Sequence, residues 1–102
     1  MGAGSQGRCA AIIGTGLIGQ GWAIVFARKG WSVRLYDVNA AMLAEARSLI
    51  LQQLRELETQ GLLEDADGII GRVHVADSLA DAVKGACYIQ ENSPEKLSLI
   101  HI

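Results

Sequence analysis

Apolar and polar residues divide the first third of the chain into two strand-like runs with a helix-like segment between them. Residues 9–13 are apolar at every position, which is typical of a parallel strand buried on both faces. The amphipathic segment 17–29 predicts a helix that ends at Gly30, and residues 32–36 predict a second strand followed by Asp37. The pattern therefore predicts a strand–helix–strand unit.

The middle of the chain predicts a long second helix. Asn39 is a suitable N-cap, and Gly61 ends the segment after about residue 60. The apolar residues of this segment recur at spacings of three and four, which places them on one helical face: Met42, Leu43, Ala46, Leu49, Ile50, Leu54 and Leu57. The opposite face of the helix is polar and charged, which predicts a solvated surface.

The remaining elements are short. They are predicted in this order: a loop over 62–71 with one helical turn at 64–69, a strand over 73–75, a helix from a cap at Asp77 or Ser78 through Val83, and a strand over 86–89. Because strands and helices alternate throughout, the economical architecture is a parallel sheet with helices on both faces. Right-handed crossovers put the second strand beside the first, and the fourth strand on the other side of the first.

A glycine-rich hexapeptide, Gly14-Thr15-Gly16-Leu17-Ile18-Gly19, joins the first strand to the first helix. In such a loop Gly14 permits the tight turn, Gly16 lets the backbone approach a pyrophosphate, and Gly19 lets the helix pack on the strand. The helix then points its N–H groups and its positive dipole end at the phosphates. An accidental glycine-rich turn is the alternative. We expect a dinucleotide to be bound by Gly14, Gly16, Leu17, Ile18 and Gly19.

Asp37 ends the second strand, eighteen residues beyond Gly19. A carboxylate at this place accepts hydrogen bonds from the ribose hydroxyls of adenosine and repels a 2′-phosphate. Neither Val38 nor Asn39 supplies a cation that could bind such a phosphate. The sequence therefore predicts NAD rather than NADP as the cofactor; the alternative is a surface aspartate that only closes the strand.

These features define the predicted fold class. It is α/β, the N-terminal half of a Rossmann-type parallel sheet with about four strands and helices on both faces. We expect residues 1–8 to be a disordered lead-in and residues 9–96 to form the NAD-binding half-domain.

Composition narrows the possible partners and sites. The net charge of −2 gives no reason to expect nucleic acid or an anionic membrane as a partner, and no apolar run approaches membrane-spanning length. The N-terminus lacks the apolar core of a signal peptide, and we expect a cytoplasmic protein. Cys9 and Cys87 are expected to be reduced, buried thiols rather than a disulfide. His74 has no second ligand at metal spacing, so no metal site is predicted.

A second informative stretch, Gln90-Glu91-Asn92-Ser93-Pro94-Glu95-Lys96, lies just past the fourth strand. In open α/β folds ligands bind at this carboxyl edge of the sheet. From spacing alone, Glu95 is better explained as an acidic residue in the first turn of a helix after Pro94 than as a ligand contact.

The chain resembles the NAD-binding domain of the 3-hydroxyacyl-CoA dehydrogenase family. The resemblance rests on the hexapeptide at Gly14, on Leu35-Tyr36-Asp37, and on Ile89-Gln90-Glu91-Asn92-Ser93-Pro94-Glu95, and covers about residues 9–97. Within the family the chain is most similar to the lambda-crystallin branch, which includes L-gulonate 3-dehydrogenase. That branch has an Ile-Gln-Glu-x-x-Pro-Glu segment, and its helix ending resembles Leu57-Glu58-Thr59-Gln60-Gly61.

The resemblance implies roles for several residues. The loop from Gly14 to Gly19 would hold the pyrophosphate, Asp37 the adenosine ribose, and Glu95 would contact NAD. The family's catalytic His and its orienting Glu would lie downstream of this chain, so no catalytic residue is assigned here. A mostly helical C-terminal domain, also downstream, would complete the substrate pocket and form a homodimer.

Two departures from the family pattern bear on the substrate. The acyl-CoA branch presents a Ser and a Lys to CoA from its second helix, and ungapped counting places Gln53 and Gln60 there. Gln cannot replace the charge of a Lys opposite a phosphate. The expected substrate is therefore a small hydroxy acid, such as L-gulonate or 3-hydroxybutyrate, oxidised at its 3-hydroxyl. The alternatives are a 3-hydroxyacyl-CoA dehydrogenase of fatty-acid metabolism, a non-catalytic crystallin-like protein and a nucleotide sensor.

The last residues depart from the family as well. The family places an NAD-contacting Lys five residues after its Glu, where this chain has Ile100. Residues 97–102 are also what the codons CTG TCT CTT ATA CAC ATC specify, the start of a transposon end used in sequencing libraries. We therefore expect these residues to be a non-native tail, and the chain to be a fragment that binds NAD weakly and is inactive alone.

Overall fold

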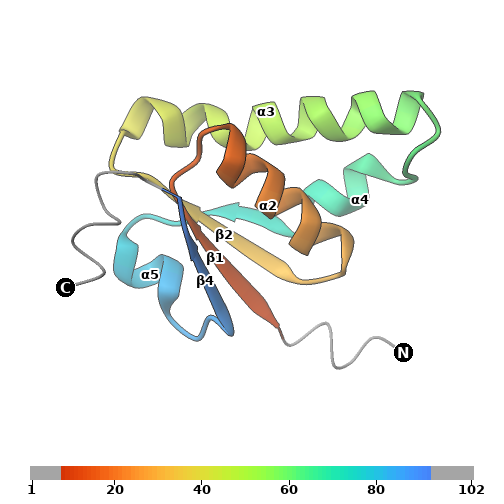
Figure 1. Ribbon diagram of the computed structural model, residues 1–102. Coiled ribbons are helices and arrows are strands. Elements are labelled where there is room, and N and C mark those ends of the chain that lie inside the picture. The colour runs from red at the N-terminus through yellow and green to blue at the C-terminus, as the bar shows by residue number, and fades with distance from the viewer. Residues whose placement is uncertain (1–7, 93–102) are drawn as a thin grey trace.

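Four parallel strands form one sheet in the computed structural model, which describes residues 8–92 (Figure 1). The strands lie in the order β3-β2-β1-β4, so that β1 is central and β4 forms one edge. The elements along the chain are β1 (Cys9–Ile13), α2 (Leu17–Arg28), β2 (Ser32–Tyr36), α3 (Ala40–Thr59), α4 (Ala66–Ile70), β3 (Val73–Val75), α5 (Leu79–Val83) and β4 (Tyr88–Glu91). The predicted α/β class and the predicted neighbours of the first strand are confirmed.

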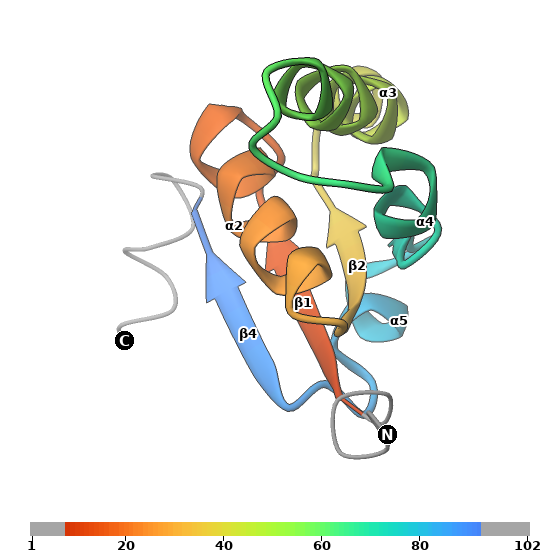
Figure 2. The same ribbon diagram turned by 90° about the vertical axis from the view of Figure 1, so that its right-hand side faces the viewer.

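Helices cover both faces of the sheet, but unequally (Figure 2). The larger core lies under α2, α3 and α4 and receives Ala10 and Ile12 from β1. The smaller core lies on the α5 side and receives Ala11 and Ile13. Because successive strand residues point to opposite faces, β1 is buried at all five positions and must be apolar throughout.

The long helix α3 follows the predicted pattern closely. The side chain of Asn39 caps it by accepting a hydrogen bond from Met42 N–H at 3.1 Å. Its buried residues Ala46, Ile50 and Leu54 are spaced by four and form one stripe against the sheet. Arg47 supports the end of this layer, since its guanidinium donates to the carbonyls of Val73 at 2.8 Å and Ile70 at 3.0 Å.

The start of the fourth strand and the exposure of several side chains differ from the prediction. Strand β4 begins at Tyr88 rather than at Ala86, because Ala86 N–H donates to Val83 O at 3.0 Å and still belongs to the turn after α5. Cys87 is exposed rather than buried because it precedes an edge strand. Trp22 and Val25 on α2 are also exposed.

No helix in the part of the chain that the structure describes is long and apolar enough to cross a membrane. Residues 1–7 of the predicted lead-in, which was expected to extend to residue 8, and the predicted tail at residues 97–102 lie outside the described residues.

The packing of α3 leads to a direct test of which residues stabilise the fold. Replacing Ile50, which is fully buried, by Ala should lower the free energy of unfolding by about 2–5 kcal/mol, because methylene burial is lost and a cavity forms. Its neighbour Leu49 is 40% exposed, and Leu49→Ala should cost less than about 1 kcal/mol. Urea unfolding of the two variants, followed by circular dichroism, makes the comparison. Equal losses would contradict the assigned orientation of α3.

Candidate functional site

The carboxyl ends of β1, β2 and β4 meet at one edge of the sheet, where the chain makes a tight glycine turn (Figure 1). Gly14 follows β1 with a φ of 97°, a backbone conformation that residues with a Cβ rarely adopt. Its N–H donates to Tyr36 O at 2.8 Å and so continues the pairing with β2. Two residues later, Gly16 is the N-cap of α2.

Gly19 is required by packing inside the protein. A Cβ at this position would lie 1.9 Å from the carbonyl oxygen of Gly14 and 3.2 Å from Nδ2 of Asn92. The first separation is far below van der Waals contact, so only glycine lets α2 approach the end of β1 this closely. The role predicted for Gly19 from the sequence matches this geometry.

Gly16 has no such internal reason to be glycine. Its φ is −73°, which any residue adopts, and an added Cβ would meet only Cε of Met42 at 3.8 Å, an ordinary contact. No side chain among residues 8–92 caps the N-terminus of α2, and the side chains of Leu17 and Ile18 in the first turn are 83% and 69% exposed. Space and free N–H groups therefore coincide at the start of this helix, and both suit an approaching phosphate.

Hydrogen bonds connect the carboxylate of Asp37 to the glycine turn. Its Oδ2 accepts hydrogen bonds from the N–H of Thr15 at 2.8 Å and the hydroxyl of Thr15 at 3.0 Å, and its Oδ1 accepts from Asn39 N–H at 2.8 Å. Partial burial alone raises the pKa of Asp37, but these hydrogen bonds outweigh it and the pKa is lowered. The carboxylate is therefore ionised at neutral pH. Three donors use three of its about four lone-pair sites, which leaves Oδ1 with capacity for a further donor.

Two side-chain amides, which the sequence did not suggest as part of the site, hold the glycine turn at Thr15 from inside the protein. Gln20, only 4% exposed on α2, donates from Nε2 to Thr15 O at 3.0 Å. Gln53 on α3 in turn donates to Oε1 of Gln20 at 2.6 Å. Within residues 8–92 every buried side-chain nitrogen and oxygen has a hydrogen-bond partner. The signal in the sequence was a single Gln among the apolar positions of an otherwise buried helical face.

The end of β4 closes the site from the other side. Asn92 N–H donates to Ile13 O at 2.8 Å, and its side-chain Nδ2 donates to the carbonyl oxygens of Ile13 at 3.3 Å and Gly14 at 3.4 Å. Gln90 and Glu91, predicted to follow the fourth strand, are its last two residues, so the stretch after β4 begins with Asn92. Asn92 lies beside the glycine turn, as the rule for open α/β sheets predicts. Glu95, also expected at this site, lies outside the described residues.

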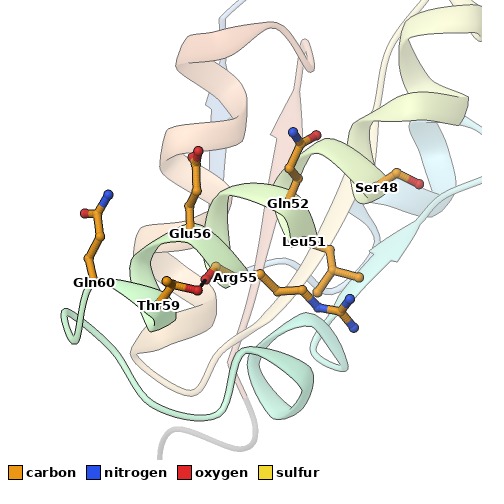
Figure 3. Close-up of a pocket in the computed structure, with 7 residues that line it drawn as sticks. All are labelled: Ser48, Leu51, Gln52, Arg55, Glu56, Thr59 and Gln60. Atoms are coloured by element: carbon orange, nitrogen blue, oxygen red, sulfur yellow. Dashed lines mark hydrogen bonds between the residues drawn. The ribbon is translucent and has the colours of Figure 1, made fainter.

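Other features of the molecule do not join this site. No group of three or more potential metal ligands occurs in the described part of the chain, and His74 is exposed on β3. A hollow of about 490 Å³ lies on the outer surface of α3 (Figure 3). It is a shallow groove, because every lining residue belongs to α3 or its C-cap: Ser48, Leu51, Gln52, Arg55, Glu56, Thr59 and Gln60.

The two glycines lead to opposite expectations for stability. Gly19→Ala should lower the free energy of unfolding by about 3 kcal/mol, because the new methyl group collides with backbone rather than with a movable side chain. Gly16→Ala should change it by no more than about 1 kcal/mol, since a weaker N-cap is offset by a less flexible unfolded chain. Thermal unfolding of both variants measures the difference. A stable Gly19→Ala protein would rule out the close approach of α2 to β1.

Comparison with known proteins gives one family. The family model described as 3-hydroxyacyl-CoA dehydrogenase, NAD binding domain, matches residues 9–101. The lambda-crystallin homolog of Rattus norvegicus is 40% identical over 91 residues, which are 86% of this chain and 28% of that protein. L-carnitine dehydrogenase of Streptomyces griseus is 39% identical over 92 residues, 90% of this chain and 27% of that protein.

A solved structure agrees with these similarities. The structure of 3-hydroxybutyryl-CoA dehydrogenase from Escherichia coli superposes with a TM-score of 0.76 at 31% identity, over 90% of this chain and 20% of that one. The chain therefore spans between 20% and 28% of the length of these three proteins.

Proposed function

The chain belongs to the 3-hydroxyacyl-CoA dehydrogenase NAD-binding domain family, and from this membership we propose that it is the cofactor-binding part of a dehydrogenase acting on a small 3-hydroxy acid. NAD is the cofactor of this family of domains. The assignment of NAD binding to the residues of the glycine turn rests on the surroundings of Gly16. It lies at the uncapped start of α2, its own protein gives it no packing reason to be glycine, and Asp37 is held nearby.

The residues around the turn divide the binding of NAD between them. The backbone from Gly14 to Gly19 and the N-terminus of α2 bind the pyrophosphate, with Leu17 and Ile18 forming the exposed first turn beside it. Asp37 uses the remaining capacity of Oδ1 to accept from a ribose hydroxyl. Glu95 contacts NAD from beyond β4. The cofactor, when bound, supplies the hydride acceptor for oxidation of the substrate hydroxyl.

The substrate we propose is a free hydroxy acid, similar to L-gulonate or 3-hydroxybutyrate, oxidised at its 3-hydroxyl. Two positions on α3 support this. Gln60 offers no charge to a CoA phosphate, and the amide of Gln53 is engaged with Gln20 inside the protein. The related proteins are named for both kinds of substrate, L-carnitine and 3-hydroxybutyryl-CoA. The alternative function is accordingly that of a 3-hydroxyacyl-CoA dehydrogenase.

We further propose that the full-length protein is a cytoplasmic homodimer whose subunits meet through a domain beyond this chain. The competing proposal, a non-catalytic protein of the lambda-crystallin kind or a nucleotide sensor, keeps NAD binding but predicts no turnover of any hydroxy acid. An assay for NADH formation by the full-length protein separates the two.

Cofactor choice tests the role of Asp37. We expect NAD to bind at least about tenfold more tightly than NADP, a difference of about 1.4 kcal/mol, because the ionised carboxylate repels a 2′-phosphate. Replacing Asp37 by Ala together with Val38→Arg should narrow or reverse the preference. Calorimetric titration with each nucleotide gives both dissociation constants.

Asp77 provides the matched control, because it is an exposed carboxylate just beyond the neighbouring strand β3. Asp77→Arg changes the net charge by the same two units as Asp37→Ala with Val38→Arg, yet should leave the ratio of the two constants unchanged. If the unmodified protein bound NAD and NADP with equal affinity, Asp37 would not be the residue that selects the cofactor.

Substrate class has its own test in the full-length protein. We expect kcat/KM for L-gulonate or 3-hydroxybutyrate to exceed that for 3-hydroxybutyryl-CoA, since the charge that binds CoA is missing at Gln60. Gln60→Lys should raise the activity toward the CoA thioester selectively, with Gln52→Lys, also exposed on α3, as the control. A clear preference of the unmodified enzyme for the thioester would assign it to fatty-acid oxidation instead.

A further inference from the structure

The side chain and the backbone of Gln20 both hold the glycine turn at Gly16. The backbone N–H of Gln20 donates to Gly16 O at 2.9 Å, and its side-chain Nε2 donates to Thr15 O at 3.0 Å. Thr15 is 1% exposed and Gln20 is 4% exposed, so the second hydrogen bond lies inside the protein. The carbonyl oxygens before and after the N-cap of α2 are therefore both fixed by one residue of that helix.

The hydrogen bond to Thr15 O also determines where the N–H of Gly16 points. This carbonyl and this N–H belong to the same peptide unit, which is planar and trans, so they point in opposite directions. Because Gln20 holds the carbonyl toward the protein interior, the N–H of Gly16 is aimed outward at the start of α2. A phosphate that approaches the N-terminus of this helix would meet that N–H.

The second amide, that of Gln53 on α3, fixes the orientation of the first. A carbonyl oxygen only accepts hydrogen bonds, so Gln20 must turn Nε2 toward Thr15 and Oε1 away from it. Oε1 then needs a donor, and Nε2 of the half-buried Gln53 provides it at 2.6 Å. A half-turn of the Gln20 amide would place its Oε1 against Thr15 O, where two acceptors repel each other. The donor on α3 opposes that rotation.

We propose that Gln20 and Gln53 are positioning residues for pyrophosphate binding: the amide on α3 orients the amide on α2, which aims the N–H of Gly16 at the nucleotide. This inference rests on the proposed function, because it assigns part of the affinity for NAD to two side chains on the inner side of the turn. An N–H that is held in place binds a phosphate without first having to be ordered. Loss of one hydrogen bond to a charged group weakens binding by about tenfold.

Gln53→Glu tests the direction of these two hydrogen bonds. The new carboxylate has the length of the amide but only accepts, so it competes with Thr15 O for Nε2 of Gln20. In amide correlation spectra of the 102-residue chain without nucleotide, we expect the signal of Gly16 to move. In a titration with NAD followed in the same spectra, we expect Kd to rise about tenfold. Gln52→Glu adds the same charge at an exposed neighbouring position of α3 and should change neither quantity.

A double-mutant cycle separates the orientation of the amides from the effect of an added charge. Gln20→Met keeps a similar side-chain shape, removes both hydrogen-bonding groups, and should by itself raise the Kd for NAD about tenfold. In the Gln20→Met background, Gln53→Glu should raise Kd by less than about twofold, because no amide is left for the carboxylate to turn. The signals of β3 and α5 should stay in place in every variant, which shows that the fold is intact.

Three results would overturn the proposal. One is a Gly16 signal that stays in place in both Gln20→Met and Gln53→Glu. Another is an equal rise in Kd for Gln52→Glu and Gln53→Glu. The last is a rise in Kd with Gln53→Glu that is as large in the Gln20→Met background as in the unmodified chain, which would assign the effect to charge alone.

The spectra without nucleotide keep this test separate from that of the proposed function. If the unmodified chain bound no NAD, the proposed function would fail. The signal of Gly16 in the variants would still decide whether the two amides orient the turn.

Discussion

The approach of helix α2 to the end of strand β1 is the constraint on which the rest of the site depends. At Gly19 there is no room for even one methyl group, because the carbonyl oxygen of Gly14 occupies its place. This contact fixes where the helix begins and aims its first N–H groups across the carboxyl edge of the sheet. A glycine at 19 is thus a requirement of packing, while the described residues around position 16 leave room for a Cβ. With the pyrophosphate-binding role proposed for Gly16, the loop combines a structural and a binding requirement within four residues.

Asp37 shows how one side chain meets both requirements. Two of its hydrogen bonds hold Thr15 in the middle of the turn, and a third orders the N-cap residue Asn39 of the next helix. The same bonds keep the carboxylate ionised and fixed, so the proposed contact with a ribose requires no further ordering of this side chain. The choice between a ribose-binding aspartate and a strand-closing one is therefore not exclusive. The structural role prepares the carboxylate for the binding role that we propose.

Most of the fold could be predicted from the sequence because its signals are local. Burial of β1 on both faces, the Asn39 cap and the four-residue stripe of α3 each leave a direct pattern in the chain. The start of β4 could not be predicted this way, since Ala86 is as apolar as a strand residue but is held in the turn by Val83. The amide chain through Gln20 depends on contacts between elements far apart in sequence. Periodicity carries no information about such contacts.

Gln53 belongs both to the hydrogen-bonded amides that support the glycine turn and to the positions that bear on the substrate class. Its Nε2 satisfies Oε1 of Gln20, which is buried, and Gln20 in turn holds the carbonyl of Thr15. A shorter side chain at position 53, such as the Ser of the acyl-CoA branch, could not span this distance and would leave Gln20 without its donor. Position 53 is thus committed to supporting the glycine turn from α3 and is not available to a ligand on the helix surface. The hydrogen bond of Gln53 to Gln20 therefore supports the free hydroxy acid that we propose as the substrate, because an amide that completes this internal network is not presented to CoA.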